Sequence, residues 1–258
     1  MTPVAPKKAL GQHFLADGNI LGVIERLAEL DPSDVVLEIG PGLGVLTRRL
    51  ADRVAHVHAI ELDRSLEPHL ADLAARPNVD LVWGDALRLD LSALTPPPRK
   101  LVANLPYNVA TPIVAESLDG LPSVELWCVM VQREVADRFF AKPSTKAYGA
   151  VSVLVQLAAR RTGFHPVSRN VFRPPPNVDS ALVAFRRTAL PLRFAEIRKV
   201  VEAAFGHRRK TLANALALAG VATREQAVAA LASIGIGPSV RAEALEPGQF
   251  VALEEALR

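Results

Sequence analysis

A glycine-rich segment follows a short apolar run of the sequence. From residue 38 it reads Glu-Ile-Gly-Pro-Gly-Leu-Gly-Val, with glycines at Gly40, Gly42 and Gly44. Glycine allows a sharp turn and lets a ligand approach where a Cβ would block it, and a helix that follows presents unpaired N–H groups to that ligand. A dinucleotide-binding loop would have glycine at Val45, and Pro41 lacks an N–H for a pyrophosphate. The segment therefore predicts a nucleoside cofactor without a diphosphate, with a plain turn as the alternative.

Two carboxylates follow the next two apolar runs. Glu61 lies about 20 residues beyond the glycines, where an acidic side chain can accept both ribose hydroxyl hydrogens, and Asp85 lies within Gly84-Asp85-Ala86. A carboxylate at the second position can accept a hydrogen bond from an adenine amino group. Ligands bind at the carboxyl ends of strands in open α/β sheets, so we expect the loop and both acids at one sheet edge.

A third polar turn, Asn104-Leu105-Pro106-Tyr107, follows the fourth apolar run. The side-chain oxygen of Asn104 and the carbonyl oxygen of Leu105 can accept hydrogen bonds from both N–H groups of an exocyclic amino group. Pro106 restricts the backbone, and Tyr107 offers a flat face on which a base can stack. The alternative is a strand-ending turn, since Asn and Pro are common in turns. Its place beside the predicted cofactor edge favours the chemical interpretation.

The elements that must position these residues alternate between β-rich runs and helical patterns, which predicts a parallel sheet covered by helices. Predicted strands cover residues 35–39, 54–60, 79–83, 101–103 and 126–131, with two more near residues 160–164 and 180–186. Asp17 is a candidate cap for a helix with apolar residues at 20, 23, 24 and 27. Residues 149–158 fit a helix or a strand, and we favour a helix.

The last part of the chain has a different pattern. The apolar residues between Ile197 and Phe205 share one helical face, and Gly206 is a candidate stop. Three further helices are predicted. One covers residues 212–219, the second begins at the capping-box pattern of residues 223–226, and the third begins near Pro247. We therefore predict two domains, an α/β domain at residues 1–188 and a small all-helical domain at residues 189–258.

The composition excludes several classes of protein. Half of the 258 residues are hydrophobic and 22% are charged, which is too apolar for a disordered chain. No apolar run approaches the ~20 residues of a bilayer span, and the N-terminus lacks the apolar core of a signal peptide. The single cysteine, Cys128, allows no internal disulfide, and the histidines at positions 56, 58, 69, 165 and 207 show no metal-ligand spacing. We predict a cytoplasmic, metal-free monomer.

Charge is distributed unevenly along the chain. Residues 160–210 contain twelve basic and three acidic residues, whereas the remainder has a net charge of −6. Such asymmetry indicates a polyanionic partner, with a solvated basic face as the alternative. Arg208, Arg209 and Lys210 lie in the predicted turn between the first two helices of the small domain, where they can bind phosphates. Lys7 and Lys8 are expected to add to the same positive field.

The tetrapeptide at residues 104–107 resembles that of S-adenosylmethionine-dependent amino-methyltransferases. With the glycine loop, residues 8–15 (Lys-Ala-Leu-Gly-Gln-His-Phe-Leu) and residues 172–180 (Phe-Arg-Pro-Pro-Pro-Asn-Val-Asp-Ser), the chain resembles the rRNA adenine N6,N6-dimethyltransferases over nearly its whole length. Residues 241–250 are similar to the C-terminal signature of the small-subunit (16S) branch. That branch dimethylates two adjacent adenosines in the last hairpin loop of 16S rRNA.

The resemblance implies a Rossmann-like methyltransferase domain with a mostly parallel seven-stranded sheet, S-adenosylmethionine as methyl donor, and no metal. The implied cofactor-binding residues are His13, Leu15, Gly40, Gly42, Gly44, Glu61, Asp85 and Asn104. The implied catalytic residues are Asn104, Leu105, Pro106 and Tyr107, which would direct the lone pair of an adenine nitrogen at the methyl group. The implied RNA-binding residues are Tyr107, Phe172, Arg208, Arg209 and Lys210.

Two of these positions carry alternatives. Phe172 would stack on a flipped adenine opposite Tyr107, or it is a core residue under a loop. His13 departs from the family, which usually has asparagine there, so contact with the methionine carboxylate is altered and donor affinity becomes sensitive to pH.

The expected function is dimethylation of 16S rRNA, within a small-subunit assembly intermediate. Three other functions compete with it. The first is methylation of 23S rRNA, the macrolide-resistance type; Leu105 and the Arg-Ala-Glu sequence from residue 241 favour the 16S branch. The second is a non-catalytic RNA-binding or assembly factor, against which the intact loop and Asn104 argue. The third, an NAD-dependent oxidoreductase, is disfavoured by Val45.

Overall fold

The structure is a computed structural model that describes residue 7 and residues 12–258. Lys8, which the sequence placed in the N-terminal motif and its positive field, lies outside these residues. The chain forms two compact units. One consists of the chain up to Ala136 together with Arg161–Arg187, and the other of Asp137–Arg160 together with Thr188–Arg258.

The first unit is built on a seven-stranded sheet in the order β4-β3-β2-β5-β6-β9-β7. The strands are β2 (Val35–Ile39), β3 (His56–Glu61), β4 (Val79–Trp83), β5 (Lys100–Asn104), β6 (Leu126–Gln132), β7 (Ala159–Val167) and β9 (Ser180–Arg187). Strands β2 to β6 pair in parallel, and β9 runs antiparallel to β6. The mostly parallel seven-stranded sheet that the sequence predicted is confirmed.

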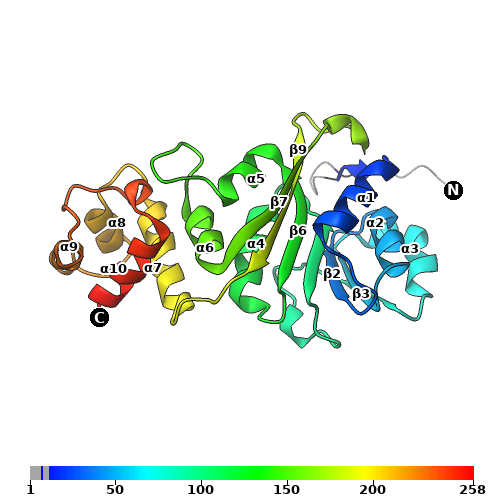
Figure 1. The fold of residues 1–258 in the computed structure, drawn as a ribbon, viewed down its shortest axis with the longest axis horizontal. Helices are drawn as coiled ribbons and strands as arrows, with labels where there is room; N and C mark the ends of the chain where they lie inside the picture. Colours follow the sequence, from blue (N-terminus) through cyan, green and yellow to red (C-terminus); the bar gives the residue numbers. More distant parts are fainter. Residues whose placement is uncertain (1–6, 8–11) are drawn as a thin grey trace. The chain divides into compact units, whose positions relative to one another are not determined.

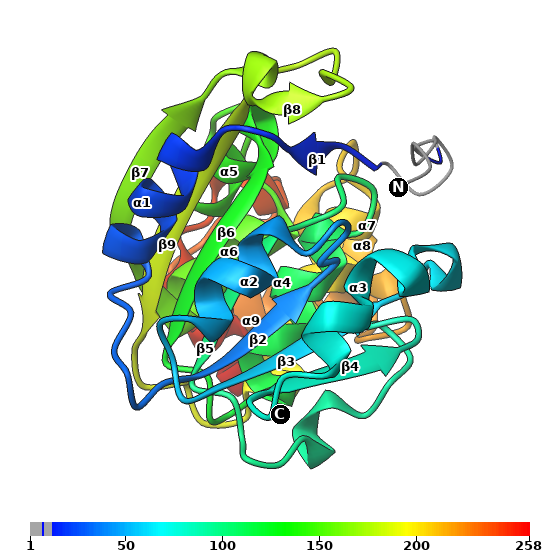
Figure 2. The same cartoon turned by 90° about the vertical axis from the view of Figure 1, so that its right-hand side faces the viewer.

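Helices cover the sheet because its strands are apolar on both faces. Figure 2 shows α1 (Gly18–Leu27), α2 (Val45–Ala51) and α3 (Glu67–Ala74) on one face of the sheet. Their apolar residues form a single core with Val36, Val57 and Val102 of the strands. Trp127, the neighbour of Cys128 in β6, donates a 2.8 Å hydrogen bond to Ser117 of α4 (Ala110–Gly120). Cys128 belongs to the core beneath α1, α2 and α3. Successive strand residues point to opposite faces, so Trp127 and the helix α4 that it contacts lie on the other face of the sheet.

The strand order reverses between β2 and β5. The chain runs outward from β2 through β3 to β4 and then crosses back to β5 on the other side of β2. The connections that leave β2 and β5 therefore diverge, and a crevice opens at the carboxyl ends of these two strands, which is where open α/β sheets bind ligands. The glycine loop follows β2, and the Asn104 turn follows β5, so the topology brings both to this crevice.

The second unit is helical. It contains α6 (Ala150–Ala158), α7 (Phe194–Gly206), α8 (Leu212–Leu218), α9 (Arg224–Ser233) and α10 (Pro247–Ala256), and α5 (Arg133–Phe139) carries the chain into it (Figure 1). The Tyr148 hydroxyl donates a 2.8 Å hydrogen bond to the carbonyl of Leu245, and the Ser144 N–H donates a 2.7 Å bond to the carbonyl of Glu243. These bonds join residues 137–160 to the C-terminal helices. The predicted boundary between residues 188 and 189 placed that segment with the sheet, and the structure corrects this.

Most local predictions agree with the structure. Residues 149–158, the segment that fitted a helix or a strand, are helical from Ala150. Asp17 accepts a hydrogen bond from the Asn19 N–H at the start of α1, and the capping box at Thr223 is present. The short antiparallel pair of β1 (Phe14–Leu15) and β8 (Phe172–Arg173) was not predicted, because two residues carry no periodicity. No helix in the described part of the chain is long and apolar enough to cross a membrane.

Gly44 offers a test of how the glycine loop is packed. Its φ is +74°, and a Cβ there would lie 2.4 Å from Leu73 Cδ1 of α3. We expect Gly44→Ala to lower the free energy of unfolding by about 2–4 kcal/mol, because alanine adds backbone strain and an overpacked contact. Urea denaturation measures this change. The matched control is Gly18→Ala, since a Cβ there meets no described atom within 4 Å; equal stability of the two variants would contradict the packing role.

Candidate active site

A pocket lies at the carboxyl ends of β2, β3, β4 and β5. The lining includes most residues that the sequence assigned to it, namely His13, Leu15, Gly40, Gly42, Glu61, Asp85, Asn104, Leu105, Pro106 and Tyr107. All of them belong to the first unit. The lining also includes Gln12, Glu38 and Leu62, to which the sequence gave no role.

The glycine loop and the Asn104 turn touch one another in this pocket. Gly40 has a φ of +75°, and a Cβ there would lie 3.2 Å from Pro106 Cδ. The Gly40 N–H donates a 2.9 Å hydrogen bond to the carbonyl of Ile60, which holds the start of the loop against β3. A side chain at Gly40 would push the two loops apart, so glycine here serves the approach of one loop to the other.

Glu61 is held at the end of β3 by the backbone. The Gly42 N–H donates a 3.1 Å hydrogen bond to Oε2, and the Asp63 N–H donates a 2.8 Å bond to Oε1. Only 5% of Glu61 is exposed, and this burial raises the pKa of its carboxyl above the usual range. Each carboxylate oxygen can accept a second hydrogen bond, so Glu61 retains the capacity to accept from ribose hydroxyls.

Asp85 lies beyond β4 and is half-exposed. Its Oδ1 accepts a 3.0 Å hydrogen bond from the Leu87 N–H, and its Oδ2 lies 3.5 Å from Arg88 Nε. The turn bond orients the carboxyl at the pocket wall. The exposed Leu62 and the neighbouring Ala86 line the same pocket and provide apolar surface beside the two acids.

Glu38, the last residue but one of β2, is a second buried acid in the pocket. It is 1% exposed, and burial raises the pKa of its carboxyl to about 8. Its Oε2 has no hydrogen-bond partner among the described residues. A buried, unpartnered carboxyl oxygen is costly unless a ligand satisfies it. The sequence offered a signal for Glu38, because a charged residue interrupts an otherwise apolar strand directly before the glycine loop.

The Asn104 turn is fixed by the strands on either side. The Leu105 N–H donates a 3.0 Å hydrogen bond to the carbonyl of Met130 in β6, and the Leu105 side chain is buried. The Asn104 amide nitrogen Nδ2 lies 3.3 Å from the carbonyl oxygen of His13, to which it donates. This bond sets the orientation of the amide, and it leaves the side-chain oxygen as the acceptor for a ligand.

Tyr107 and His13 form one wall of the pocket. The Tyr107 hydroxyl lies 2.5 Å from the Ser180 hydroxyl, and burial raises the pKa of the tyrosine above its usual range. The two rings lie 5.6 Å apart between centroids. His13 Nδ1 donates a 2.9 Å hydrogen bond to the carbonyl of Pro174, so only Nε2 remains for a ligand.

Two predicted site residues lie elsewhere. Phe172 is fully buried in the core of the first unit, where it pairs with Leu15 across β1 and β8. It presents no ring face to a base, so the stacking role is corrected to the core alternative. The Phe-Arg-Pro segment reaches the pocket through the Pro174 carbonyl instead. Gly44 does not line the pocket, and its missing side chain accommodates α3.

The basic turn of the helical unit lies between α7 and α8. Arg208, Arg209 and Lys210 are all exposed. Arg208 Nη2 donates a 3.0 Å hydrogen bond to the carbonyl of Tyr148 and lies 3.8 Å from Glu243 Oε2. Arg208 therefore also holds the turn against its own unit, whereas Arg209 and Lys210 extend the exposed positive charge.

The strand order, the glycine loop after β2 and the acids after β3 and β4 define an S-adenosylmethionine-dependent methyltransferase. The sequence profile of the ribosomal RNA adenine dimethylase family matches residues 5–258. The chain belongs to this family.

Individual relatives agree with this assignment. The chain is 50% identical to a ribosomal RNA small subunit methyltransferase A from Rubrobacter xylanophilus, over 96% of this chain and 94% of that protein. It is 46% identical to a protein of the same name from Streptomyces coelicolor, over 98% and 91%. Among solved structures, the 23S rRNA methyltransferase ErmE is similar with a TM-score of 0.65 and 31% identity, over 95% and 99% of the two chains. A Plasmodium falciparum dimethyladenosine transferase has the same fold, with a TM-score of 0.77, 24% identity and 93% and 96% coverage.

Glu38 predicts a pH dependence of stability. From about pH 4.5 to pH 8 the folded chain keeps a proton on Glu38 that the unfolded chain releases. The contribution of this proton to the free energy of unfolding is therefore complete below pH 4.5 and is lost as the pH rises through 8. Glu38→Gln stays neutral throughout. We expect its stability relative to the parent chain to rise by about 2–5 kcal/mol between pH 5 and pH 9, measured by urea denaturation.

The control for this prediction is Glu255→Gln, which makes the same charge change at an exposed position. Its stability relative to the parent should be independent of pH. A Glu38→Gln curve parallel to that of Glu255→Gln would show that Glu38 is ionised in the folded chain.

Proposed function

We propose that this chain dimethylates the N6 amino groups of two adjacent adenosines in the 3′-terminal hairpin loop of 16S rRNA. One observation carries the proposal. The Asn104–Tyr107 turn lies in the same pocket as the glycine loop and the two acids beyond β3 and β4. This arrangement supports the proposal, because candidate acceptors for an amino group lie beside a candidate nucleoside site, in a chain whose relatives are named for small-subunit rRNA.

The pocket supplies what adenine N6 needs in order to react. Its lone pair is delocalised into the ring, which makes the amino group a poor nucleophile. The Asn104 side-chain oxygen and the Leu105 carbonyl would accept hydrogen bonds from the amino group and favour a tetrahedral nitrogen. The nitrogen lone pair would form the N–CH3 bond as the S–CH3 bond of the donor breaks, so that the sulfur leaves as a neutral thioether and the methylated nitrogen then loses one proton to solvent. Pro106 holds the carbonyls in place, and Tyr107 stacks on the base after it leaves its RNA context. Positioning and electrostatics account for the acceleration, and the chain requires no nucleophile of its own.

The pocket also fits the donor. S-adenosylmethionine supplies a methyl group on a positively charged sulfur, with an ammonium, a carboxylate and an adenosine. The unpartnered Oε2 of Glu38 and the loop at Gly40 and Gly42 suit such a cationic nucleoside. Glu61 suits its ribose hydroxyls, and Asp85 suits its adenine amino group. His13 would contact the carboxylate through Nε2, and Leu15 would contribute its backbone.

The nearest alternative is methylation of 23S rRNA, which the similarity to ErmE favours. The relatives named for the small subunit are more similar, at 46–50% identity over nearly the whole chain, against 31% for ErmE. A non-catalytic assembly factor is disfavoured because such a protein has no need of aligned amino-group acceptors. The identities therefore favour the 16S assignment.

The helical region at residues 189–258, together with residues 137–160, is proposed to bind the RNA. Arg209 and Lys210 project from the exposed turn and would bind phosphates, which adds affinity without sequence information. We further propose that the chain acts as a monomer in the cytoplasm, on rRNA within a small-subunit assembly intermediate.

Methylation of the two rRNAs in parallel tests the function. Unmethylated small-subunit and large-subunit rRNA, each naked and in particles, are incubated with the chain and donor, and their nucleosides are analysed by mass spectrometry. We expect two N6,N6-dimethyladenosines per small-subunit rRNA. Asn104→Ala should lose at least about 100-fold in rate while folding normally by circular dichroism, since it lacks one amino-group acceptor.

Product confined to large-subunit rRNA would overturn the 16S assignment. Near-normal turnover by Asn104→Ala would instead overturn the role of the pocket. The two failures are therefore distinguishable.

The double variant Arg209→Ala/Lys210→Ala tests the RNA-binding turn. Removing two phosphate contacts should weaken RNA binding and reduce the slope of log affinity against log salt by about 1.4. Filter binding over a range of salt concentrations measures the slope. The control is Arg53→Ala/Arg76→Ala, which removes the same charge from residues paired with Glu25 and Asp52. Identical slopes for both double variants would refute the assignment.

A further inference from the structure

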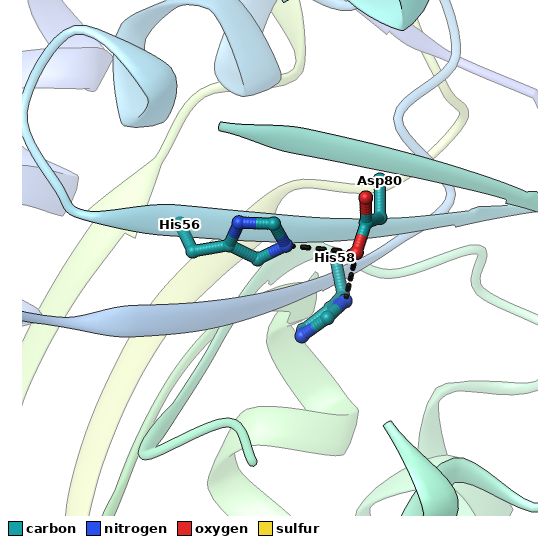
Figure 3. A group of neighbouring side chains, drawn as sticks. All are labelled: His56, His58 and Asp80. Carbon is teal, nitrogen blue, oxygen red and sulfur yellow. Dashed lines mark hydrogen bonds and ion pairs between the residues drawn. The ribbon is translucent and has the colours of Figure 1, made fainter. Parts of the chain in front are cut away.

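A second group of ligand-type side chains lies on the sheet away from the pocket. His56 and His58 are the first and third residues of β3. Asp80 lies on β4, directly opposite His58 in the strand register. Residues two apart on a strand share a face, as do directly paired residues. Figure 3 shows both imidazoles directed at the carboxylate of Asp80. The pocket, by contrast, is reached by the opposite end of β3, at Glu61.

The hydrogen bonds of this cluster are incomplete. His56 Nε2 lies 2.9 Å from Asp80 Oδ2. His58 is 1% exposed, and its Nε2 donates a 2.8 Å hydrogen bond to the carbonyl of Pro96. A carbonyl only accepts, so the proton of a neutral His58 ring resides on Nε2 and Nδ1 carries a lone pair. That Nδ1 has no hydrogen-bond partner among the described residues and lies 3.4 Å from Asp80 Oδ2.

The lone pair of the buried His58 ring faces the oxygen of a carboxylate that is itself half-exposed. This is an unfavourable arrangement for a neutral ring, and a cation between the two atoms removes the repulsion. The bond to Pro96 is the one that metal-binding histidines usually make, because a backbone carbonyl fixes the tautomer and leaves the other nitrogen for the metal. The arrangement of His58 is therefore that of a ligand.

The distances also fit a small divalent metal ion. Two ligand atoms about 2.0–2.1 Å from a tetrahedral Zn²⁺ are about 3.4 Å apart. The two nitrogens lie 2.9 Å and 3.4 Å from Asp80 Oδ2, and all three ligand atoms lie within 4.8 Å of one another. Asp80 is half-exposed, so an ion has a path to the site and water can complete its coordination.

We propose that His56 Nε2, His58 Nδ1 and Asp80 Oδ2 form a binding site for a divalent transition metal ion, with Zn²⁺ as the ion that this donor set suits best. Two imidazoles and one carboxylate favour such ions over Mg²⁺ or Ca²⁺, which prefer oxygen ligands. The bound ion would join the edge strand β4 to β3 and, through His58 and Pro96, to the connection before β5. The site is structural, since it touches no residue of the methyltransferase pocket.

The histidine spacing of the sequence did not indicate this site. His56 and His58 are two ligands on one strand, and the third lies 22 residues beyond them in the chain, where nothing local marks it. Strand register alone aligns Asp80 with His58.

Zinc binding by the untagged chain tests the proposal. The chain is freed of metal with a chelator and then titrated with Zn²⁺ alone, in competition with a chromophoric chelator. We expect one tight equivalent per chain and a rise in Tm of several degrees. Asp80→Asn and His56→Ala, which leave the buried His58 in place, should each lower the affinity at least about 10-fold.

His69→Ala is the matched control, because it removes a histidine of the same unit outside the cluster. It should bind zinc as the parent chain does. The Co²⁺-loaded chain should show the strong visible absorption of a tetrahedral site, and Asp80→Asn should lose it. Zinc affinity equal in the parent and Asp80→Asn, or no tight equivalent in the parent, would overturn the proposal and leave His56 and Asp80 as an ordinary ion pair.

Discussion

The close contact between two loops at the reversal of strand order is the constraint on which the active site depends. Gly40 has no Cβ, so the ring of Pro106 can lie where a side chain would otherwise stand. The loop that follows β2 and the turn that follows β5 thus form one pocket rather than two neighbouring surfaces. A methyl donor and an amino group must come within bonding distance, and this contact sets how near their binding residues can lie.

The pocket combines rigid backbone hydrogen bonds with carboxyl groups that are poorly solvated. Glu61 is bonded to the backbone of the loop that it faces, and Leu105 is bonded to the neighbouring strand. Burial raises the pKa of both Glu38 and Glu61. A positively charged ligand is favoured in such a place, because it offsets the loss of solvation of the acids. Burial favours the neutral form of both acids, whereas a positive charge beside them would favour the ionised form.

The N-terminal segment and the proline-rich segment act together at the mouth of the pocket. β1 and β8 pair through Leu15 and Phe172, and His13 donates to the carbonyl of Pro174. The Gln12 side chain in turn donates a 2.9 Å hydrogen bond to Asp63, just beyond β3. These contacts bring the His13 carbonyl to the Asn104 amide and determine which end of the amide faces a ligand. Phe172 thus supports the site from the core, although it lies outside the pocket.

Local pattern was sufficient for the strands, the caps at Asp17 and Thr223, the glycine loop, Glu61 and the Asn104 turn. Each of these depends on residues close together in the chain, whose hydrophobic spacing or turn chemistry is visible in the sequence. Only the tertiary structure decided that Phe172 is buried, that Gly44 accommodates a helix, that residues 137–160 join the C-terminal helices and that Asp80 faces His58. Those outcomes depend on strand register and on packing between segments distant in sequence, and register shifts of one residue reverse which face a side chain occupies.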